Sequence, residues 1–228
     1  MPLQIRPASE ADGSRLGCIA RDAFRDTLSR AIFPSHLHCK SETGDPGLDE
    51  AQWRTTRTLR RMREGKPTFV VVDVPEQDNS SEVLVGFAQW EPPSQPTSFD
   101  GAASTDPAQE MAKDPLPPSL DANKLQEMYD IIDCETKKAL GPEGHSKMWY
   151  LMLLAVDPQQ QRRGIGKMLV RHGLDLAAQA GTDAFVIATT EGRGMYQSQG
   201  FSQVGEAFEM GNRPHYSMLW RKPAMPVS

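Results

Sequence analysis

The 228-residue sequence lacks the long hydrophobic run and the cysteine spacing that mark two large classes of protein. No apolar run approaches the ~20 residues of a membrane-spanning helix, so we expect no membrane partner. The three cysteines, Cys18, Cys39 and Cys134, show no Cys-x-x-Cys or Cys/His spacing. A disulfide framework and a metal site are therefore not expected, and a cytoplasmic, reducing compartment is the simplest expectation.

An excess of positive charge is also missing, since 25 lysines and arginines face 30 aspartates and glutamates. The resulting net charge of −5 argues against a nucleic-acid partner. The charge is unevenly spread, because residues 73–135 carry 14 acidic and two basic side chains while the rest of the chain is basic. We interpret this acidic part as a solvated segment, with attraction of a cationic amine as the alternative.

Alternating strand-like and helix-like segments predict an α/β fold, with a sheet of mixed direction and helices on both faces. The strands are expected at Leu3–Arg6, Thr68–Asp73, Val83–Trp90, Met148–Val156, Asp183–Ala188, Phe201–Met210 and His215–Trp220. A helix near Asp49–Glu64 carries Arg54, Arg57, Arg60, Arg61 and Arg63. We expect these arginines to form a solvated helix surface rather than a phosphate-facing patch.

The composition changes between about residues 91 and 140, where a segment rich in proline and serine precedes a helical pattern. A loop of this length is either mobile or functional. Gly141-Pro142 ends the helix. We interpret residues 91–140 as an acidic loop-and-helix insertion in a single domain spanning residues 1–228.

The most informative stretch begins with the apolar run Met148–Val156, which Asp157-Pro158 ends before a glycine loop opens into a helix. A strand, a glycine loop and a helix together aim backbone N–H groups and the positive end of a dipole at an anion. The loop fits neither a nucleoside-triphosphate P-loop nor a dinucleotide fingerprint. We therefore expect a phosphate or pyrophosphate to bind at Gln161, Arg162, Arg163, Gly164, Ile165, Gly166 and Lys167.

The segment Gln161-Arg-Arg-Gly-Ile-Gly166 resembles the Gln/Arg-x-x-Gly-x-Gly/Ala signature of the GNAT (Gcn5-related N-acetyltransferase) family. Downstream, Tyr196-Gln-Ser-Gln-Gly-Phe201 resembles the Tyr-x-x-x-Gly-Phe segment of that family. The resemblance covers most of the chain from Leu3 to about Arg221, apart from residues 91–140. It implies a GNAT-like, mostly antiparallel central sheet with a splayed central strand, and an acyltransferase that uses acetyl-CoA without a metal.

The resemblance also assigns roles to individual residues. Backbone groups of Leu154, Ala155 and Val156 would pair with the pantetheine arm, and one amide would polarise the acetyl carbonyl. Residues 161–167 would hold the pyrophosphate. Tyr196 matches the family tyrosine that acts as general acid on the coenzyme sulfur, and its alternative role is packing.

The general base is the point at which the sequence departs from the family. Histone-type members carry a glutamate six positions before the Val156 equivalent, where this chain has Tyr150. Glu91 is our candidate base, acting through water. Weaker candidates are Asp130, Asp133, Glu135, His145 and His172.

We therefore predict an N-acetyltransferase that transfers acetyl from acetyl-CoA to an amine by direct attack in a ternary complex, and we expect the acceptor to be a small molecule rather than a histone. One alternative is a protein N-terminal or lysine acetyltransferase. Another is a catalytically inactive acyl-CoA-binding regulatory protein. The chain is expected to be a monomer or a homodimer.

Overall fold

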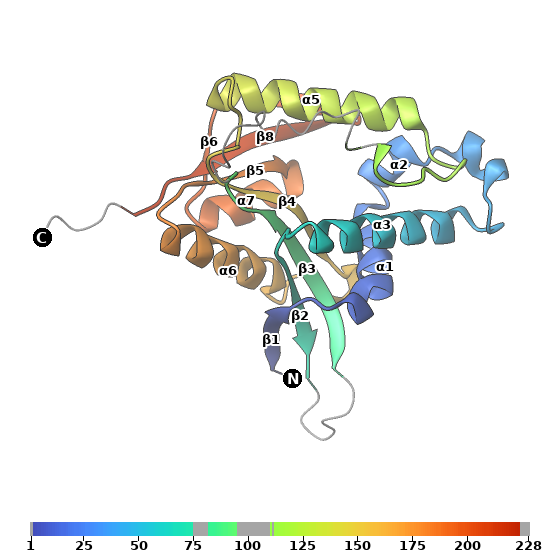
Figure 1. Cartoon of the computed structure of the whole chain (residues 1–228), viewed down its shortest axis with the longest axis horizontal. Coiled ribbons are helices and arrows are strands. Elements are labelled where there is room, and N and C mark those ends of the chain that lie inside the picture. Colours follow the sequence, from blue (N-terminus) through green and yellow to red (C-terminus); the bar gives the residue numbers. More distant parts are fainter. Residues whose placement is uncertain (1, 75–81, 95–109, 111, 224–228) are drawn as a thin grey trace, which may run out of the picture.

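The structure, a computed structural model, describes residues 2–74, 82–94, 110 and 112–223 (Figure 1). Its eight-stranded sheet has the order β1-β2-β3-β4-β5-β8-β6, with β7 paired to β8. The strands are β1 (Leu3–Pro7), β2 (Thr68–Asp73), β3 (Val83–Glu91), β4 (Trp149–Val156), β5 (Ala184–Thr189), β6 (Ser202–Gln203), β7 (Phe208–Met210) and β8 (Arg213–Trp220). The helices are α1 (Gly13–Phe24), α2 (Leu28–Ile32), α3 (Pro46–Arg63), α5 (Ala122–Leu140), α6 (Ile165–Gln179) and α7 (Thr190–Ser198), with short 3-10 turns η1 (Glu10–Asp12), η2 (Ser35–Lys40) and η3 (Pro158–Gln160).

The pairing within the sheet is antiparallel except between β4 and β5, which run parallel. These two strands pair only at Trp149 with Ala184 and at Tyr150 with Phe185. Beyond Tyr150, β4 continues to Val156 against β3 alone. The central strand is therefore splayed from β5, as predicted, and a gap opens in the middle of the sheet.

One face of the sheet is covered by α6 and α7. Leu169 and Val170 of α6 are fully buried there against the sheet residues Trp90 and Met218. The helix approaches closely because Gly173 lies over Trp90, where an added Cβ would come within 2.1 Å of the indole ring. Apolar burial of this kind is the main force that holds such a layer together.

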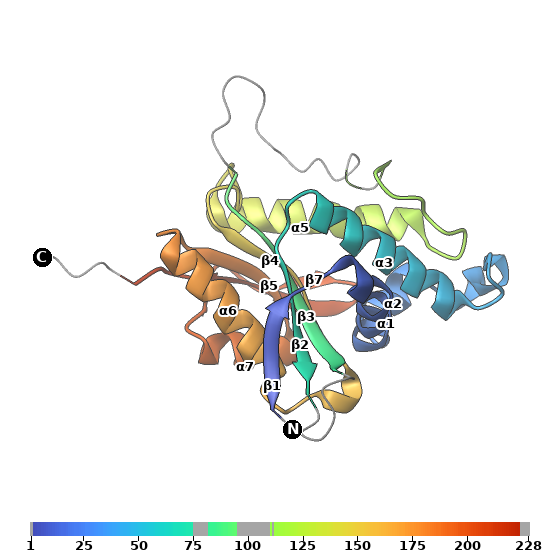
Figure 2. The ribbon, with the colours of Figure 1, turned by 60° about the horizontal axis from the view of Figure 1, so that its bottom comes forward.

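The opposite face is covered by α1 and α3 over β2–β4, and by α5 over β7 and β8 (Figures 1 and 2). Along β8, Met218 belongs to the core under α6 and α7, whereas His215 faces the other way and stacks on Phe208 at 6.1 Å. Phe208 in turn packs with residues of α5 and α3. The helix predicted within residues 91–140 thus forms, and it packs on the sheet face that α3 also covers.

The mixed α/β fold predicted from the sequence is confirmed, with two local differences. The prediction of a single strand over residues 201–210 is wrong, because strand structure stops at the end of β6 and begins again only at the start of β7. Gly205 lies in this break with φ +73°, a left-handed conformation far from that of a regular strand. The short α2 and η2 were not predicted, since residues 28–40 are too few per element to show a helical period. Among the described residues, no helix is long and apolar enough to cross a membrane.

Candidate active site

The glycine loop lies at the end of β4, where the sheet opens. Asp157 accepts a hydrogen bond from the Gln159 amide at 2.9 Å and so starts η3. The chain then turns through two left-handed residues, Arg162 (φ 67°) and Gly164 (φ 85°), before α6 begins at Ile165. A non-glycine residue at positive φ is uncommon and marks a tightly determined turn.

The first backbone N–H groups of α6 are available to an anion. The first four N–H groups of a helix have no partner within it, and no side chain caps this helix at Gly164. Residues 161–164 and Lys167 are exposed, so the positive end of the helix dipole faces solvent at the open edge of the sheet. The loop therefore presents backbone donors and positive charge to solvent, and phosphate binding by residues 161–167 stays a prediction.

The helix start is fixed by packing on the strands. Ile165 is 2% exposed, and Gly86 of β3 lies beneath it, where an added Cβ would come within 2.8 Å of Ile165 Cγ2. A Cβ at Gly166 would lie 3.9 Å from both Leu154 of β4 and Met195 of α7. The loop, the free side of β4 and α7 thus converge at one place.

The polar side chains of the loop are placed differently from one another. Arg163 donates a hydrogen bond to Asp73 at 2.7 Å and also contacts Gln160, so it braces the loop against β2. The Gln161 amide lies 3.5 Å from the Val156 carbonyl. Arg162 and Lys167 make no side-chain hydrogen bond or ion pair with the described residues. Among the basic side chains of the loop, these two are therefore free of described partners and could meet an anion.

The three β4 residues predicted to contact the pantetheine arm lie in the splayed part of the strand. Leu154, Ala155 and Val156 pair with Ala88, Phe87 and Gly86 of β3, and β5 does not pair with them on the other side. Backbone groups on that side have no β5 partner. A linear group that carries amides of its own could pair with them in the gap.

Tyr196 projects from α7 into the core beside this gap and is 6% exposed. Thr189 caps the helix by accepting a hydrogen bond from the Gly192 amide at 3.2 Å, and the Tyr196 ring packs edge-on against Phe201 at 5.6 Å. Burial raises the pKa of the phenol well above its ordinary value, and neighbouring Tyr150 adds to this shift. The phenol therefore stays protonated, and can donate a proton, throughout the neutral range.

Tyr150 occupies the last paired position before β4 and β5 separate. Its neighbours Trp149 and Leu151 point into the core under α6, so Tyr150 lies on the opposite face, where its ring contacts His145 at 4.2 Å and Phe185 at 5.9 Å. Burial, reinforced by the charge of Glu91, raises its pKa to about 12. Tyr150 and Tyr196 thus approach the apex of the gap from opposite faces.

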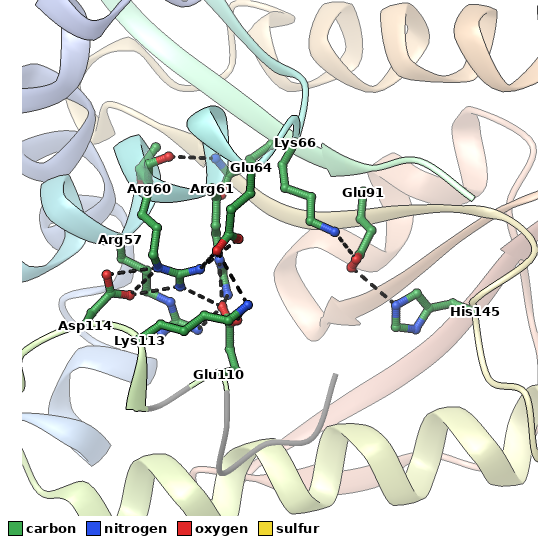
Figure 3. Close-up of polar contacts among 12 residues, drawn as sticks. Arg57, Arg60, Arg61, Glu64, Lys66, Glu91, Glu110, Lys113, Asp114 and His145 are labelled. Atoms are coloured by element: carbon green, nitrogen blue, oxygen red, sulfur yellow. Dashed lines mark hydrogen bonds and ion pairs between the residues drawn. The ribbon is translucent and has the colours of Figure 1, made fainter. Parts of the chain in front are cut away.

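Glu91 ends β3, paired with Tyr150, and lies between two basic side chains (Figure 3). Lys66 forms an ion pair with it, and His145 Nε2 lies 3.5 Å from Glu91 Oε2. Burial alone would raise the pKa of Glu91, but the hydrogen bonds from His145 and Lys66 outweigh it and lower the pKa to about 2. Glu91 is thus an ionised carboxylate already bound by its own neighbours.

The other candidate bases lie away from the gap. Asp130 and Glu135 line a shallow groove on the outer side of α5, and Asp133 pairs with Lys137 at 2.7 Å. His172 of α6 packs edge-on against Phe69 at 4.3 Å, on the opposite face of the sheet from Tyr150. Within the described ranges, no cluster of three or more metal-ligating side chains occurs.

The arginines of α3 contradict the expectation of a solvated surface. Arg54 and Arg61 are buried, and only Arg63 has most of its side chain exposed, at 60%. Arg54 pairs with Glu50 at 2.7 Å, while Arg60 and Arg61 both bind Glu110 at 2.9 Å (Figure 3). Since Glu110 lies some 50 residues further along the chain, no local pattern could show this pairing.

The same contacts correct the interpretation of the acidic segment as solvated. Glu110 and Asp114 are buried, and Asp114 binds Arg60 at 2.9 Å. Ser119 is fully buried and donates a hydrogen bond to Asp49 at 2.8 Å. At these positions the segment between β3 and α5 is fastened to α3 by buried polar contacts.

We expect Glu110→Gln to lower the free energy of unfolding at pH 7 by about 3 kcal/mol. Burial disfavours the ionised Glu110, but the charge of Arg61 and hydrogen bonds from Arg60 and Arg61 lower its pKa from 4.5 to about 2. This contribution is complete above about pH 4.5 and disappears as the pH falls toward 2. Urea unfolding of wild type and variant should therefore converge over that pH interval.

Glu10→Gln is the matched control, because Glu10 pairs with exposed Arg63 at 2.7 Å on the same helix. Exposed pairs contribute little to stability, so this variant should unfold like the wild type. Equal, small effects of both substitutions would show that the buried network does not stabilise the fold.

Part of the sequence matches a known protein family, and the fold resembles solved structures. Residues 131–222 match the family model described as acetyltransferase (GNAT) domain. The match begins inside α5 and runs through the glycine loop and Tyr196 to the end of β8. The predicted resemblance to the GNAT family is confirmed. No curated protein sequence matches the chain significantly.

Solved structures of acetyltransferases resemble the whole chain. A structure named as histone acetyltransferase HPA2 and related acetyltransferase from Corynebacterium glutamicum has 20% identity and a TM-score of 0.63, with all of both chains covered. PaiA N-acetyltransferase from Thermoplasma acidophilum, in complex with coenzyme A, has 13% identity and a TM-score of 0.52, covering 97% of this chain and 99% of that one. YncA from Salmonella typhimurium, with its cofactor acetyl-CoA, has 16% identity and a TM-score of 0.51, covering 99% and 96%. At these identities the likeness establishes the fold.

Proposed function

We propose that this chain, of which residues 131–222 match the GNAT acetyltransferase domain, transfers an acetyl group from acetyl-CoA to an amine, by direct attack in a ternary complex. One observation carries the proposal. The two central strands part after Tyr150, and β4 leads to the start of α6 at Gly164, which no side chain caps and which approaches Met195, the neighbour of Tyr196 on α7. PaiA and YncA, which share the fold, are described with coenzyme A and acetyl-CoA.

The donor would be held at two places. Free amides at the start of α6, with Arg162 and Lys167, would bind the pyrophosphate, while Arg163 keeps the loop in shape through Asp73. The unpaired side of β4 at Leu154, Ala155 and Val156 would pair with the amides of the pantetheine arm. A β4 amide that points at the acetyl oxygen would stabilise its developing negative charge, which typically contributes ~2.7–4 kcal/mol.

We propose that Tyr196 is the general acid that donates a proton to the sulfur of the leaving coenzyme A. A tyrosine phenol of ordinary pKa ~10 is protonated at neutral pH, and burial raises the pKa of Tyr196 further. A phenol can protonate a thiolate of pKa ~8.5 efficiently only if the proton moves as the C–S bond breaks. The capped α7 and the packing on Phe201 fix the ring for such a transfer.

Glu91 remains our candidate on the proton-accepting side, with a refined role. A carboxylate whose pKa is about 2 is a weak base toward an ammonium group. It can, however, orient His145 or a bound water next to Tyr150, at the position where histone-type members carry their glutamate. We therefore propose that Glu91 acts through these neighbours.

The acceptor that we propose is a small amine. The sheet face on which Tyr150 lies is covered by α3 and α5, whose apolar residues join β7 in one cluster. Such cover suits an enclosed acceptor better than an extended peptide. The first alternative is a protein N-terminal or lysine acetyltransferase. The second alternative is a catalytically inactive acyl-CoA-binding regulatory protein.

The test is a screen of primary amines and short peptides with acetyl-CoA, in which free thiol release is measured. We expect turnover with small amines at a rate that depends on protein concentration and exceeds turnover with any peptide. Preferential acetylation of peptides would favour the alternative. Tight binding of acetyl-CoA without thiol release from any acceptor would identify a regulatory protein instead.

A further inference from the structure

We propose that Arg57 binds a carboxylate of the acceptor, so that the substrates of this chain are amines that also carry a carboxylate group. This inference rests on the acetyltransferase function proposed above and names its substrate class. It starts from a buried guanidinium that packs between aromatic rings but donates no hydrogen bond to any described residue.

Arg57 is mostly buried, with 14% of its side chain exposed, and it donates no side-chain hydrogen bond to any described residue. Its Nε is buried without a partner. The guanidinium instead lies over two aromatic rings, 5.2 Å from the centre of Trp53 and 5.0 Å from the centre of Tyr129. These contacts position a cation but leave its hydrogen-bond donors unused.

The charges around Arg57 do not balance. The network in Figure 3 joins four cations to three carboxylates, and they are Arg57, Arg60, Arg61, Lys113, Glu64, Glu110 and Asp114. Glu110 is committed to Arg60 and Arg61 at 2.9 Å and only approaches Arg57, at 3.9 Å. Among the described residues the cations of this network therefore outnumber its carboxylates by one. Arg57 is the buried cation of the set that has no carboxylate within hydrogen-bond distance in the described part of the chain, and burying such a charge without an anion is costly.

Two further buried groups at this place have no partner among the described residues. They are the indole Nε1 of Trp53 and the phenol oxygen of Tyr129, from the same two rings that contact Arg57. Buried polar atoms are nearly always hydrogen-bonded in native proteins. Several unpaired donors around one uncompensated guanidinium therefore point to an anionic ligand with more than one acceptor oxygen, and a carboxylate matches the planar guanidinium fork.

This site lies on the sheet face that carries Tyr150. Thr58, next to Arg57 on α3, accepts a hydrogen bond from Gln89 of β3 at 3.2 Å. Two residues further along β3, Glu91 pairs with Tyr150, where β4 and β5 begin to separate. The phosphate loop lies at the other end of β4. Arg57 is therefore placed to hold the acceptor rather than the phosphates of the coenzyme.

The experiment compares amines that differ only in the carboxylate. Glycine, β-alanine, 4-aminobutyrate and 5-aminopentanoate are each paired with methylamine, ethylamine, propylamine or butylamine, and kcat/KM is measured by thiol release. At least one amino acid should exceed its paired amine by ~10- to 100-fold, the effect of hydrogen bonds to a charged group. The chain length at which this occurs measures the span between the amine and carboxylate sites.

Arg57→Met should abolish this preference while acetyl-CoA affinity stays within two-fold, since methionine keeps the packing between the rings but not the charge. Arg57→Lys should keep only part of the preference, because an ammonium lacks the fork. Arg63→Met is the matched control, on the same helix but in an exposed pair with Glu10. It should leave the preference unchanged.

Other results would overturn the proposal. If Arg57→Met lowers kcat/KM equally for both members of each pair, Arg57 has a structural role. If it weakens acetyl-CoA binding, Arg57 belongs to the coenzyme site. If the alkylamines are acetylated with the same kcat/KM as their paired amino acids, this inference fails while the proposed function stands.

Calorimetric titration of the same amino acids into CoA-saturated protein measures their binding independently of turnover. Binding to wild type that Arg57→Met abolishes would support the carboxylate site even if no acceptor is acetylated and the proposed function fails. No binding of any of the four amino acids, together with no turnover of them, would refute it.

Discussion

Tyr196→Phe is expected to lower kcat for acetyl transfer by 10²–10⁴-fold while leaving acetyl-CoA affinity unchanged. The substitution removes only the hydroxyl group, and the ring keeps its packing on Phe201 and over Gly192. Because burial raises the pKa of this phenol, the wild type should keep its proton donor across the neutral and moderately alkaline range. Turnover is measured by thiol release, and affinity by calorimetry.

A structural role for Tyr196 makes a different set of predictions. If the phenol transfers a proton as the C–S bond breaks, kcat should show a solvent deuterium isotope effect that is lost in Tyr196→Phe. Tyr216→Phe is the matched control, since this half-buried tyrosine of β8 packs on the same core and under Arg193 at 4.4 Å. Unchanged kcat in Tyr196→Phe, or equal losses in both variants, would assign Tyr196 to packing.

The parts of the site that the sequence could predict are contiguous in the chain. The strand end at Val156, the turn at Gly164 and the start of α6 follow one another within about a dozen residues, so spacing and residue type determine the local shape. The separation of β4 from β5 was implied by the family resemblance. It depends on long-range pairing and could not be derived from residues 148–156 alone.

The parts that could not be predicted are contacts between distant segments. Glu110 lies 49 residues from Arg61, and His145 lies 54 residues from its partner Glu91. An amphipathic pattern distinguishes apolar from polar faces, but it cannot tell a solvated arginine from a paired, buried one. The expectation of a solvated α3 surface failed for this reason. The one available signal is the density of arginine in α3 together with the acidic segment that follows, and this pattern by itself is equally compatible with two independent solvated surfaces.

The role of Glu91 also depends on contacts between distant segments. Its position at the end of β3 could be predicted, and β3 does pair Glu91 with Tyr150. Its partners could not, because Lys66 and His145 come from the loops that precede β2 and β4. Those partners bind the carboxylate and lower its basicity. We therefore expect Glu91 to orient a neighbouring group rather than to accept the proton itself.

Gly164→Glu should abolish measurable acetyl-CoA binding, with a loss of at least ~100-fold, while circular dichroism stays native. The new carboxylate would lie at the N-terminus of α6, where the helix dipole attracts it and the free amides can bind it. It would then occupy the donors that the pyrophosphate needs and repel the phosphates as well. Losing two hydrogen bonds to a charged group accounts for a factor of this size.

Two variants separate this mechanism from backbone strain. Gly164 has φ +85° with no atom within 4 Å of an added Cβ, so Gly164→Ala adds strain without charge and should bind acetyl-CoA within about ten-fold of wild type. Gly181, at the other end of α6, has φ +65° and the same open surroundings. Gly181→Glu therefore adds equal strain and charge away from the loop, and its affinity should be unchanged. Micromolar binding retained by Gly164→Glu would mean that the coenzyme does not bind at this helix, and the proposed function would lose its foundation.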